Sequence, residues 1–338
     1  MRSLNDVCVV LGIESTAHTF SASIIKGNSK EADILSDIRE VYIPPEGSGI
    51  HPREASRHHS EKAPKVLRDA LNEANLKIND VDAIAFSAGP GLGPCLRVGA
   101  VIARTISVFF SKPLVPVNHA IGHIELASML TGAINPVILL VSGGHTLISA
   151  FNSGRWRIFG ETLDITVGQL IDQFGRELGF SSPCGRKVES LAGDSSHYIS
   201  LPYSVKGNDV SLSGLLTAAK RSLMKNVSIQ NLASSIQENA FSMLTEVVER
   251  AMAFSGKEEV LLTGGVAANK TLQKMLTNMC KSRGGKLFTI PINYSGDCGA
   301  QIAWTGLLYH LSGFNVNVAE SVIRQSWRID QVDAIWRS

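Results

Sequence analysis

The stretch V-I-L-L-V-S-G-G-H-T-L-I-S-A-F-N-S-G-R-W-R-I-F-G-E-T, residues 137–162, carries the strongest indication of the fold. Its apolar runs predict three successive strands, at residues 137–141, 146–151 and 156–162, with glycine-containing turns between them. Three strands in a row fit many folds. They become informative here because the chain contains the same arrangement once before, near its N-terminus.

The order of predicted elements is the same in both parts of the chain. The first part predicts strands at residues 7–13, 20–25 and 34–43, a helix at 53–74, a strand at 81–87, a helix at 96–110, a strand at 114–117 and a helix at 119–130. The second part follows its three strands with a helix at 229–254, a strand at 259–263, a helix at 269–283, a strand at 286–290 and a helix from Asp297.

A duplicated βββαβαβα order is the order of the two lobes of the actin-like ATPase (ASKHA) fold. We therefore predict a two-lobed α/β protein, with an N-terminal lobe at residues 1–135 and a C-terminal lobe at 136–338. Residues 164–225 interrupt the second copy and predict a mostly helical insertion. In open α/β sheets, ligands bind at the carboxyl ends of the strands, so we expect a site between the lobes.

Composition limits the possible classes of protein. With 44% hydrophobic and 18% charged residues, the 338-residue chain is expected to be compact rather than disordered. A net charge of +2 means that any nucleic-acid surface must be a local patch. The five cysteines form no C-x-x-C pair, which favours a reducing compartment over a disulfide framework or a thiolate zinc site. No apolar run reaches the roughly 18 residues that span a bilayer, so we expect a cytoplasmic protein without membrane contact.

Two histidines in V-N-H-A-I-G-H are the first candidate ligands of a metal ion. His119 and His123 lie four residues apart, so a helix would present both imidazoles on one face. The best candidate for a third ligand is Asp297, which glycines flank in S-G-D-C-G. The spacing is also compatible with one capping and one core histidine. A metallopeptidase is disfavoured because Ala120 stands where the zincin pattern requires glutamate.

Three glycine-rich turns follow predicted strands, at residues 87–95, 140–146 and 262–269. Glycine lets backbone N–H groups face an anion, and a helix that begins directly afterwards adds its partial positive charge. Asn269 could then donate to a ribose or a phosphate. Tight hairpin geometry is the alternative explanation of such turns. The P-loop motif G-x4-G-K is absent, which excludes a Walker-type nucleotide site.

Several long motifs in the right order resemble one family over nearly the whole chain. The chain resembles the tRNA N6-adenosine threonylcarbamoyltransferase family (TsaD in bacteria), and in particular its archaeal and eukaryal branch within the KEOPS complex. The motifs are L-G-I-E-S-T-A-H-T (11–19), P-P-E-G-S-G-I-H-P-R (44–53), G-P-G-L-G-P-C-L-R-V (89–98), K-G-N-D-V-S-L-S-G-L-L-T-A (206–218) and I-R-Q-S-W-R-I-D-Q-V-D (323–333).

The resemblance implies an activity and a set of site residues. The activity is transfer of the threonylcarbamoyl group from threonylcarbamoyl-AMP to N6 of adenosine 37, in tRNAs that read codons beginning with A, with release of AMP. The implied metal ligands are His119, His123 and Asp297, with Fe(II) favoured and Zn(II) possible. The residues implied to hold the adenylate, ATP or another adenine nucleotide are Leu140, Val141, Ser142, Gly143, Gly144, Asp172, Gly185, Glu189 and Asn269.

This sequence departs from the family pattern at a few of these positions. Leu140 replaces a tyrosine that would be a further metal ligand, and His145 replaces an asparagine. P-C-G-R at residues 183–186 replaces Pro-Gly-Gly-Pro, and Gln169 stands where Asn or Glu is usual. No general base stands out. The remaining candidates for that role are Glu14 and His145, each of which also fits a structural role.

The resemblance also implies partners: tRNA, a small atypical protein kinase and small accessory subunits of the KEOPS type. Two groups of residues could contact the RNA. The first contains Arg53, Arg57, His58, His59, Lys62, Lys65 and Arg68, and the second contains Arg324, Trp327, Arg328, Trp336 and Arg337. A solvated helix face explains the first group equally well.

Two other functions fit the same fold. An ATP-dependent kinase or ATPase would need Mg²⁺ but not the histidine pair. A nucleotide-binding regulatory scaffold of a kinase complex would bind ATP and form no product.

Overall fold

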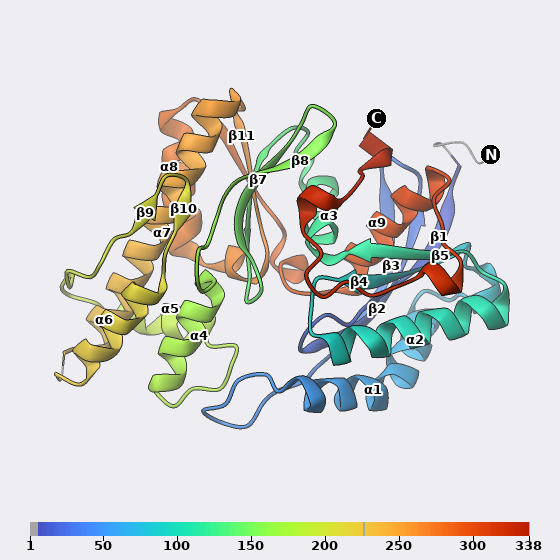
Figure 1. Ribbon diagram of the computed structural model, residues 1–338, viewed down its shortest axis with the longest axis horizontal. Coiled ribbons are helices and arrows are strands. Elements are labelled where there is room, and N and C mark those ends of the chain that lie inside the picture. Colours follow the sequence, from blue (N-terminus) through green and yellow to red (C-terminus); the bar gives the residue numbers. More distant parts are fainter. Residues whose placement is uncertain (1–5, 226, 338) are drawn as a thin grey trace.

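The computed structural model describes residues 6–225 and 227–337. Its core contains two five-stranded sheets, which lie side by side along the long axis of the molecule (Figure 1). The first sheet contains β1 (Cys8–Glu14), β2 (Thr19–Gly27), β3 (Ala32–Val41), β4 (Ala83–Gly89) and β5 (Leu114–Asn118), in the order β3-β2-β1-β4-β5. The second contains β6 (Val137–Val141), β7 (Thr146–Asn152), β8 (Arg155–Glu161), β11 (Glu259–Thr263) and β12 (Lys286–Thr289), in the order β12-β11-β6-β7-β8.

The two sheets have the same topology, which confirms the predicted duplication. In each sheet the first three strands pair in antiparallel fashion, and the later two are parallel to the first strand. The strands β4 and β6 are buried at every position, as expected of continuous apolar runs. Parallel pairing brings the carboxyl ends of β1, β4 and β5 to one edge, and those of β6, β11 and β12 to one edge of the other sheet.

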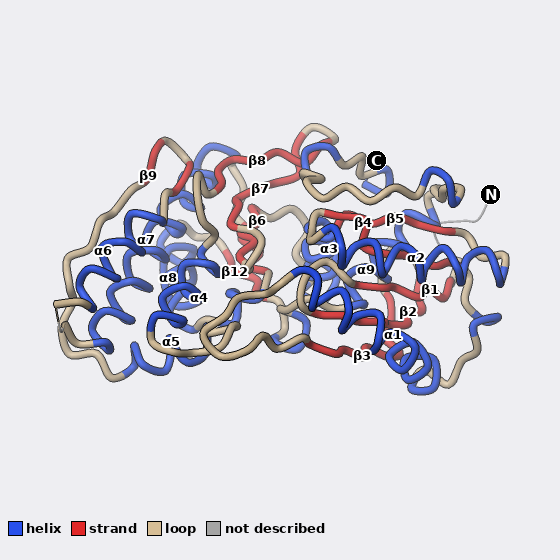
Figure 2. The backbone as a smooth tube through the Cα atoms, turned by 60° about the horizontal axis from the view of Figure 1, so that its bottom comes forward, coloured by secondary structure: helices blue, strands red, loops and turns tan. Residues whose placement is uncertain are grey.

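Helices cover both faces of each sheet. α1 (Pro52–Glu73) and α2 (Gly93–Phe110) pack on one face of the first sheet, and α9 (Gly299–Leu311) covers the opposite face (Figure 1). α7 (Ile229–Ser255) and α8 (Lys270–Ser282) pack against the second sheet. α3 (His119–Thr131) lies between the two sheets and contacts strands of both (Figure 2). This helix is therefore the central element of the site.

The path of the chain after the second sheet differs from the expected division. Helix α9 packs mainly on β1, β2 and β4. The segment 317–337 first runs beside the first sheet, where Arg324 N donates to the Ala88 carbonyl, and its last ten residues contact β7 and β8 of the second sheet. The division at 135/136 assigned both to the second unit, whereas α9 packs on the first sheet and the segment joins the two sheets. The physical reason is that the apolar face of α9 fits the open face of the first sheet. Residues 1 and 338, the outer limits of that division, lie outside the described residues.

The insertion in the second copy is largely helical, as predicted, but it also contains a short hairpin. It consists of α4 (Val167–Glu177), α5 (Gly185–Gly193), the two-residue strands β9 (Val205–Lys206) and β10 (Asp209–Val210), and α6 (Ser213–Leu223). Asp164 anchors the insertion to β8, because its carboxylate accepts hydrogen bonds from Ser211 Oγ, Leu212 N and Ser213 N. These bonds hold the pKa of Asp164 well below its usual value, although partial burial opposes them.

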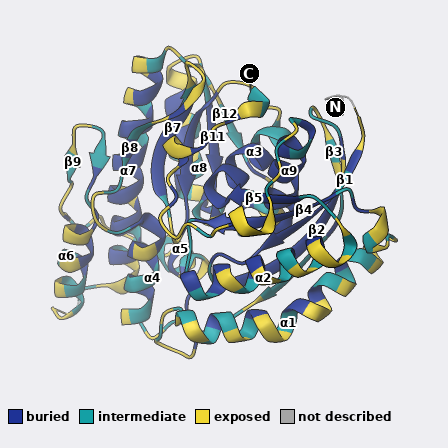
Figure 3. Ribbon diagram, turned by 45° about the vertical axis from the view of Figure 1, so that its right-hand side comes forward, coloured by how far each residue is buried: buried dark blue, intermediate teal, exposed yellow. Residues whose placement is uncertain are grey.

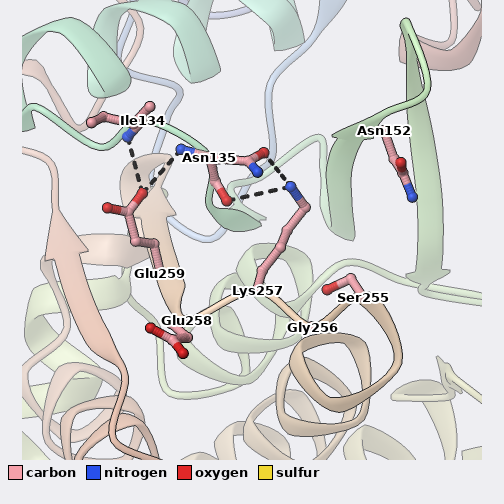
Figure 4. A pocket seen from close by; sticks show the side chains of 8 residues that line it. All are labelled: Ile134, Asn135, Asn152, Ser255, Gly256, Lys257, Glu258 and Glu259. Atoms are coloured by element: carbon pink, nitrogen blue, oxygen red, sulfur yellow. Dashed lines mark hydrogen bonds between the residues drawn. The ribbon is translucent and has the colours of Figure 1, made fainter.

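The linker between α3 and β6 is fixed by two charged residues (Figure 4). The Glu259 carboxylate accepts hydrogen bonds from Ile134 N and Asn135 N, both at 3.0 Å, and Lys257 bonds the side chain of Asn135. An open pocket of about 390 Å³ adjoins these residues. None of the candidate site residues lines it. The linker thus holds the C-terminal end of α3 to the edge of the second sheet.

Helix α2 is the one helix among the described residues that is long and apolar enough to cross a membrane. It packs against β4 and α1, while its outer face is exposed (Figure 3). Arg104 lies in its middle and donates to Ser321 Oγ at 2.8 Å. Its apolar residues therefore contribute to the protein core, and α2 is not a membrane span.

Candidate active site

The site begins where β5 passes into α3. Asn118 ends the strand and caps the helix, since its Oδ1 accepts hydrogen bonds from Ala120 N (3.0 Å) and Ile121 N (3.1 Å). His119 is the first residue of the helix, and every residue from there to Ala127 is buried. The helix ends at Gly132 in the left-handed conformation (φ 73°). The two histidines consequently lie one turn apart on a rigid, buried helix start.

The structure brings the three predicted metal ligands together. Asp297 Oδ1 lies 3.3 Å from His123 Nε2 and 3.6 Å from His119 Nε2, and the three donor atoms all lie within 4.8 Å of one another. If each donor is about 2.1 Å from one ion, neighbouring donors lie roughly 3.0–3.4 Å apart. The two histidines are buried, whereas the Asp297 side chain is 15% exposed. The three side chains therefore fit a divalent ion that would keep open positions on one side.

Asp297 was predicted to begin a helix, but it lies outside α9. It occupies the loop before α9, two residues ahead of Gly299. This position turns its carboxylate toward the start of α3 instead of along the α9 axis.

A buried carboxylate sets the orientation of His119. Glu14, at the end of β1, is fully buried, and its Oε2 accepts a hydrogen bond from His119 Nδ1 at 2.8 Å. Nδ1 is thereby the protonated nitrogen, and Nε2 faces Asp297. Gln301 on α9 donates to the same Glu14 oxygen at 3.4 Å. Sequence reasoning missed Gln301. The sequence feature that could have identified it is a single polar amide within the otherwise apolar run A-Q-I-A-W. The structure shows that this amide is fully buried.

The protonation states of the three ligands differ because their neighbours differ. Burial alone would lower the pKa of His119, but the Glu14 carboxylate raises it to about 9. Burial lowers the pKa of His123, so its ring is neutral at pH 7. Burial would raise the pKa of Asp297, but the hydrogen bond from His123 and the charge of His119 hold it well below its usual range. Without an ion, the set therefore contains one imidazolium, one neutral imidazole and one carboxylate.

His145 contributes to the site from the second sheet. Its ring stacks near that of His119, with centroids 6.1 Å apart and an angle of 28° between the planes. Burial, with a smaller effect of the neighbouring His119 and His123 rings, lowers the pKa of His145 to about 3. Such a ring stays neutral at physiological pH and is a poor general base. Glu14 accepts hydrogen bonds from His119 and from Thr16 N (2.6 Å), so its carboxylate is already occupied by donors of the protein.

Two of the predicted glycine turns lie next to each other. An added Cβ on Gly264 would lie 2.3 Å from the Val141 carbonyl oxygen, and Gly264 has φ 95°. Only glycine therefore allows the 264–269 turn to approach the 142–145 turn so closely. Gly143 and Gly144 are exposed, and an added Cβ on either would meet no atom within 4 Å. Leu140 and Val141 are buried strand residues, and a leucine side chain offers no ligand atom to an ion.

The other candidate adenylate residues gather beside these turns. Glu189 Oε1 accepts a hydrogen bond from Lys270 N at 2.7 Å, and Asp172 Oδ1 accepts one from Cys184 N at 2.7 Å. An added Cβ on Gly185 would meet open space. Asn269 caps α8 with its Oδ1 and donates Nδ2 to Gln237 Oε1 at 2.6 Å. Gln237 was not predicted from the sequence. The feature that could have identified it is a polar amide on the buried, apolar side of α7.

Two amides of the third predicted turn, at residues 87–95, are bonded within the protein. Gly91 N donates to the Gln325 carbonyl (3.2 Å), and Leu92 N donates to the Thr16 carbonyl (2.8 Å). These two amides are not available to an anion, and the role expected of the turn stays a prediction. Its glycines serve close packing, because an added Cβ on Gly89 would lie 1.9 Å from the Arg324 carbonyl oxygen.

Two of the departures from the family pattern now have a structural account. Gln169 forms a capping box with Thr166 at the start of α4. Arg186 is exposed and lies in the first turn of α5.

The two cationic groups differ in how many charges remain available. On α1, Arg57 pairs with Glu54 and Glu61, and Lys62 and Lys65 lie near Glu40 of β3. His59 is buried, and its pKa is lowered to about 4, chiefly by burial. Arg53 and Arg68 are exposed and have no carboxylate partner among the described residues.

Most side chains of the second group form contacts within the protein. Arg337 and Trp336 bond Glu125, Arg328 pairs with Glu161, and Trp327 is buried. Trp327, Trp336 and Arg337 pack polar or aromatic groups against the protein, and contact of this second group with RNA stays a prediction.

Comparison with solved structures shows that the protein has the actin-like ATPase (ASKHA) fold. T. kodakarensis HypF superposes with a TM-score of 0.64 at 12% identity, over 92% of this chain and 48% of that chain. An activator of 2-hydroxyisocaproyl-CoA dehydratase from Clostridium difficile superposes with a TM-score of 0.54 at 11% identity, over 91% and 99% of the two chains. At these identities the similarity establishes the fold alone.

Sequence comparison gives the family. The family model of tRNA N6-adenosine threonylcarbamoyltransferase (TsaD) matches residues 33–304. The enzyme of that name from Thermofilum pendens is 50% identical over 100% of this chain and 98% of its own length. The one from Caldivirga maquilingensis is 48% identical over 97% and 98%. This chain belongs to the tRNA N6-adenosine threonylcarbamoyltransferase family, and it transfers a threonylcarbamoyl group to N6 of adenosine in tRNA. The resemblance inferred from the sequence is confirmed, and the kinase and scaffold alternatives are not favoured.

Proposed function

We propose that the transfer takes place beside a divalent ion held by His119, His123 and Asp297, with threonylcarbamoyl-AMP as the donor. The convergence of these three side chains from α3 and from the loop before α9 supports the ion site. Two imidazoles and one carboxylate suit Fe(II), and Zn(II) accepts the same ligands. When bound, the ion would supply Lewis-acid polarisation or a template for the substrate.

The protein's own residues would orient the donor. We propose that the Val141–Gly144 turn, where Gly143 and Gly144 are exposed, receives phosphate oxygens, with Asp172, Gly185, Glu189 and Asn269 around the nucleoside. The adjacent position of the two glycine turns supports this arrangement. Phosphate charge that develops as AMP leaves would then lie against polar backbone that is already in place. The acceptor would be adenosine 37 of tRNAs that read codons beginning with A, in the cytoplasm.

The direct test combines the chain with threonylcarbamoyl-AMP and unmodified tRNA, followed by mass spectrometry of the nucleosides. We expect N6-threonylcarbamoyladenosine, with one AMP released per modified tRNA. We further propose that partners of the KEOPS type, a small atypical kinase and small accessory subunits, act with this chain. The assay is therefore run with and without them. ATP hydrolysis without modified nucleoside under all conditions would instead favour a kinase-type function.

Ion binding should release a proton. Because Glu14 raises the pKa of His119 to about 9, its Nε2 carries a proton at pH 7.5 that the ion must displace. We expect about one proton released per Zn²⁺ bound at pH 7.5, and an apparent affinity that rises roughly tenfold per pH unit up to about pH 9. Calorimetry in buffers of different ionisation enthalpy measures this number.

The matched variants for this measurement are Glu14→Gln and Glu61→Gln. Without the Glu14 charge, burial keeps His119 neutral, so Glu14→Gln should release almost no proton. Glu61 is exposed on α1, and its variant should behave as the wild type. Equal proton release from all three proteins would contradict the assignment.

We propose that the exposed cations of α1 contribute to tRNA binding. Reversing the two unpaired charges, Arg53→Glu with Arg68→Glu, should weaken tRNA binding and flatten its salt dependence. The charge-matched control is Arg221→Glu with Lys225→Glu, two exposed cations at the C-terminal end of the helical insertion. Filter binding at several salt concentrations measures both quantities. If the double variant and the control bind tRNA equally, α1 is not part of the RNA surface.

A further inference from the structure

A second buried carboxylate lies on α3, close to the histidines. Glu125 is 4% exposed and is two residues beyond His123. Arg337 donates to both of its oxygens, from Nε to Oε1 (2.7 Å) and from Nη2 to Oε2 (2.8 Å). Trp336 Nε1 donates to Oε1 at 3.1 Å. Glu125, Trp336 and Arg337 are named the Glu125 clamp below.

The clamp joins three parts of the fold that are far apart in the sequence. The Trp336 ring packs edge-on against Tyr309 of α9, with centroids 4.5 Å apart. The Arg337 guanidinium lies 5.4 Å from the ring centre of Phe151 on β7 and 5.0 Å from that of Trp156 on β8. Glu125 itself belongs to α3. A single arginine thus contacts the histidine helix and the second sheet, and its neighbour Trp336 contacts α9.

These elements are the ones that carry the proposed ligands. Both histidines lie on α3, whereas Asp297 enters from the loop that leads directly into α9. The segment 317–337 also holds the start of α3, because Asn118 Nδ2 donates to the Trp327 carbonyl at 3.0 Å. A shift of α3 relative to α9 would therefore change the distances between the imidazoles and the carboxylate.

We propose that Glu125, Trp336 and Arg337 are positioning residues of the metal site. The inference rests on the ion site proposed above. A buried ion pair adds little net stability, because desolvation of both charges offsets their attraction. A bidentate guanidinium–carboxylate pair, however, fixes the relative orientation of the elements that it joins. The clamp holds α3 in the register in which His119 and His123 reach the same ion as Asp297.

The test measures Zn²⁺ affinity of the full chain by competition with a chromophoric chelator, together with the thermal midpoint of the metal-free protein. Arg337→Ala and Glu125→Gln should each weaken Zn²⁺ binding by about tenfold or more, at a temperature where the metal-free variants are folded. The matched control is Arg328→Ala, which removes an exposed ion pair with Glu161 from the same segment. Its Zn²⁺ affinity should stay within about twofold of the wild type. Arg337→Lys keeps the positive charge but cannot form two parallel hydrogen bonds to the carboxylate, so it should give an intermediate Zn²⁺ affinity.

A lower thermal midpoint with unchanged Zn²⁺ affinity in Arg337→Ala would assign the clamp a purely structural role and overturn the inference. If Arg337→Ala and Glu125→Gln do not fold, Arg337→Lys decides, and wild-type affinity in that variant would also overturn the inference. A wild-type protein that binds no Zn²⁺, Fe²⁺ or Co²⁺ would remove the ion site itself, and the inference with it. Weakened binding in both clamp variants but not in Arg328→Ala would support the inference.

Discussion

Asp297→Asn should abolish ion binding and modified-adenosine formation while leaving the protein folded. The amide matches the carboxylate in shape but lacks the charge that an ion held by two neutral imidazoles requires. We expect the Zn²⁺ affinity to fall by about 100-fold or more, and product formation to fall by at least the same factor. Metal analysis of the purified protein and mass spectrometry of the tRNA nucleosides measure the two effects.

The control for this variant is Asp69→Asn, which changes an exposed carboxylate paired with Lys65. It should retain metal content and product formation. The metal-free Asp297→Asn protein should still be folded at the assay temperature, but with a lower thermal midpoint than the metal-free wild type, because removing one partner of a buried charged pair is destabilising. Full metal content together with full activity in Asp297→Asn would reject the site.

Gly299→Ala should lower the free energy of unfolding by about 3 kcal/mol. An added Cβ on Gly299 would lie 2.6 Å from Ser23 N and 2.9 Å from the Gly12 carbonyl oxygen. These are backbone atoms of paired strands, which cannot move aside as a flexible side chain would. The start of α9 would have to move away from the first sheet. Denaturant titration of the metal-free protein measures the loss.

Gly296→Ala is the matched control, since the same methyl group is added three residues earlier. Nothing lies within 4 Å of a Cβ at Gly296, so its free energy of unfolding should change by less than about 0.5 kcal/mol. Gly296 lies in the loop beside Asp297 and Gly299 lies at the start of α9, so crowding around the added Cβ is the main difference between the two variants. Equal stability of the two proteins would show that α9 does not pack on the first sheet as described.

Sequence periodicity was sufficient to predict the strands and helices and their duplication. The strands at 137–141 and 259–263 begin and end where predicted, because continuous apolar runs bounded by turn residues have few alternatives. The pair His119 and His123 was also predictable, since the helix period places both rings on one face. In contrast, Asp297 was placed at a helix start, and the structure shows it in the preceding loop.

Local sequence was misleading wherever the partner of a residue is distant in the chain. The cations of α1 appeared unpaired, but Glu40 comes from a neighbouring strand. The aromatic and cationic residues near the C-terminus were expected at an RNA surface, and Arg337 is instead bonded to Glu125. Two amides in the turn at 87–95, which was expected to face an anion, bond backbone carbonyls of distant segments.

The amino-acid sequence alone predicts the fold, the family and the types of ligand in the candidate site, because each of these depends on periodicity or on short motifs. Three further features depend on the folded protein: the distance between Asp297 and the histidines, the proton held on His119 by Glu14, and the packing of α9 on the first sheet. The reason is that charge, burial and contact in these cases arise between segments more than 100 residues apart. Such pairs form only when the two sheets and the helix between them have packed.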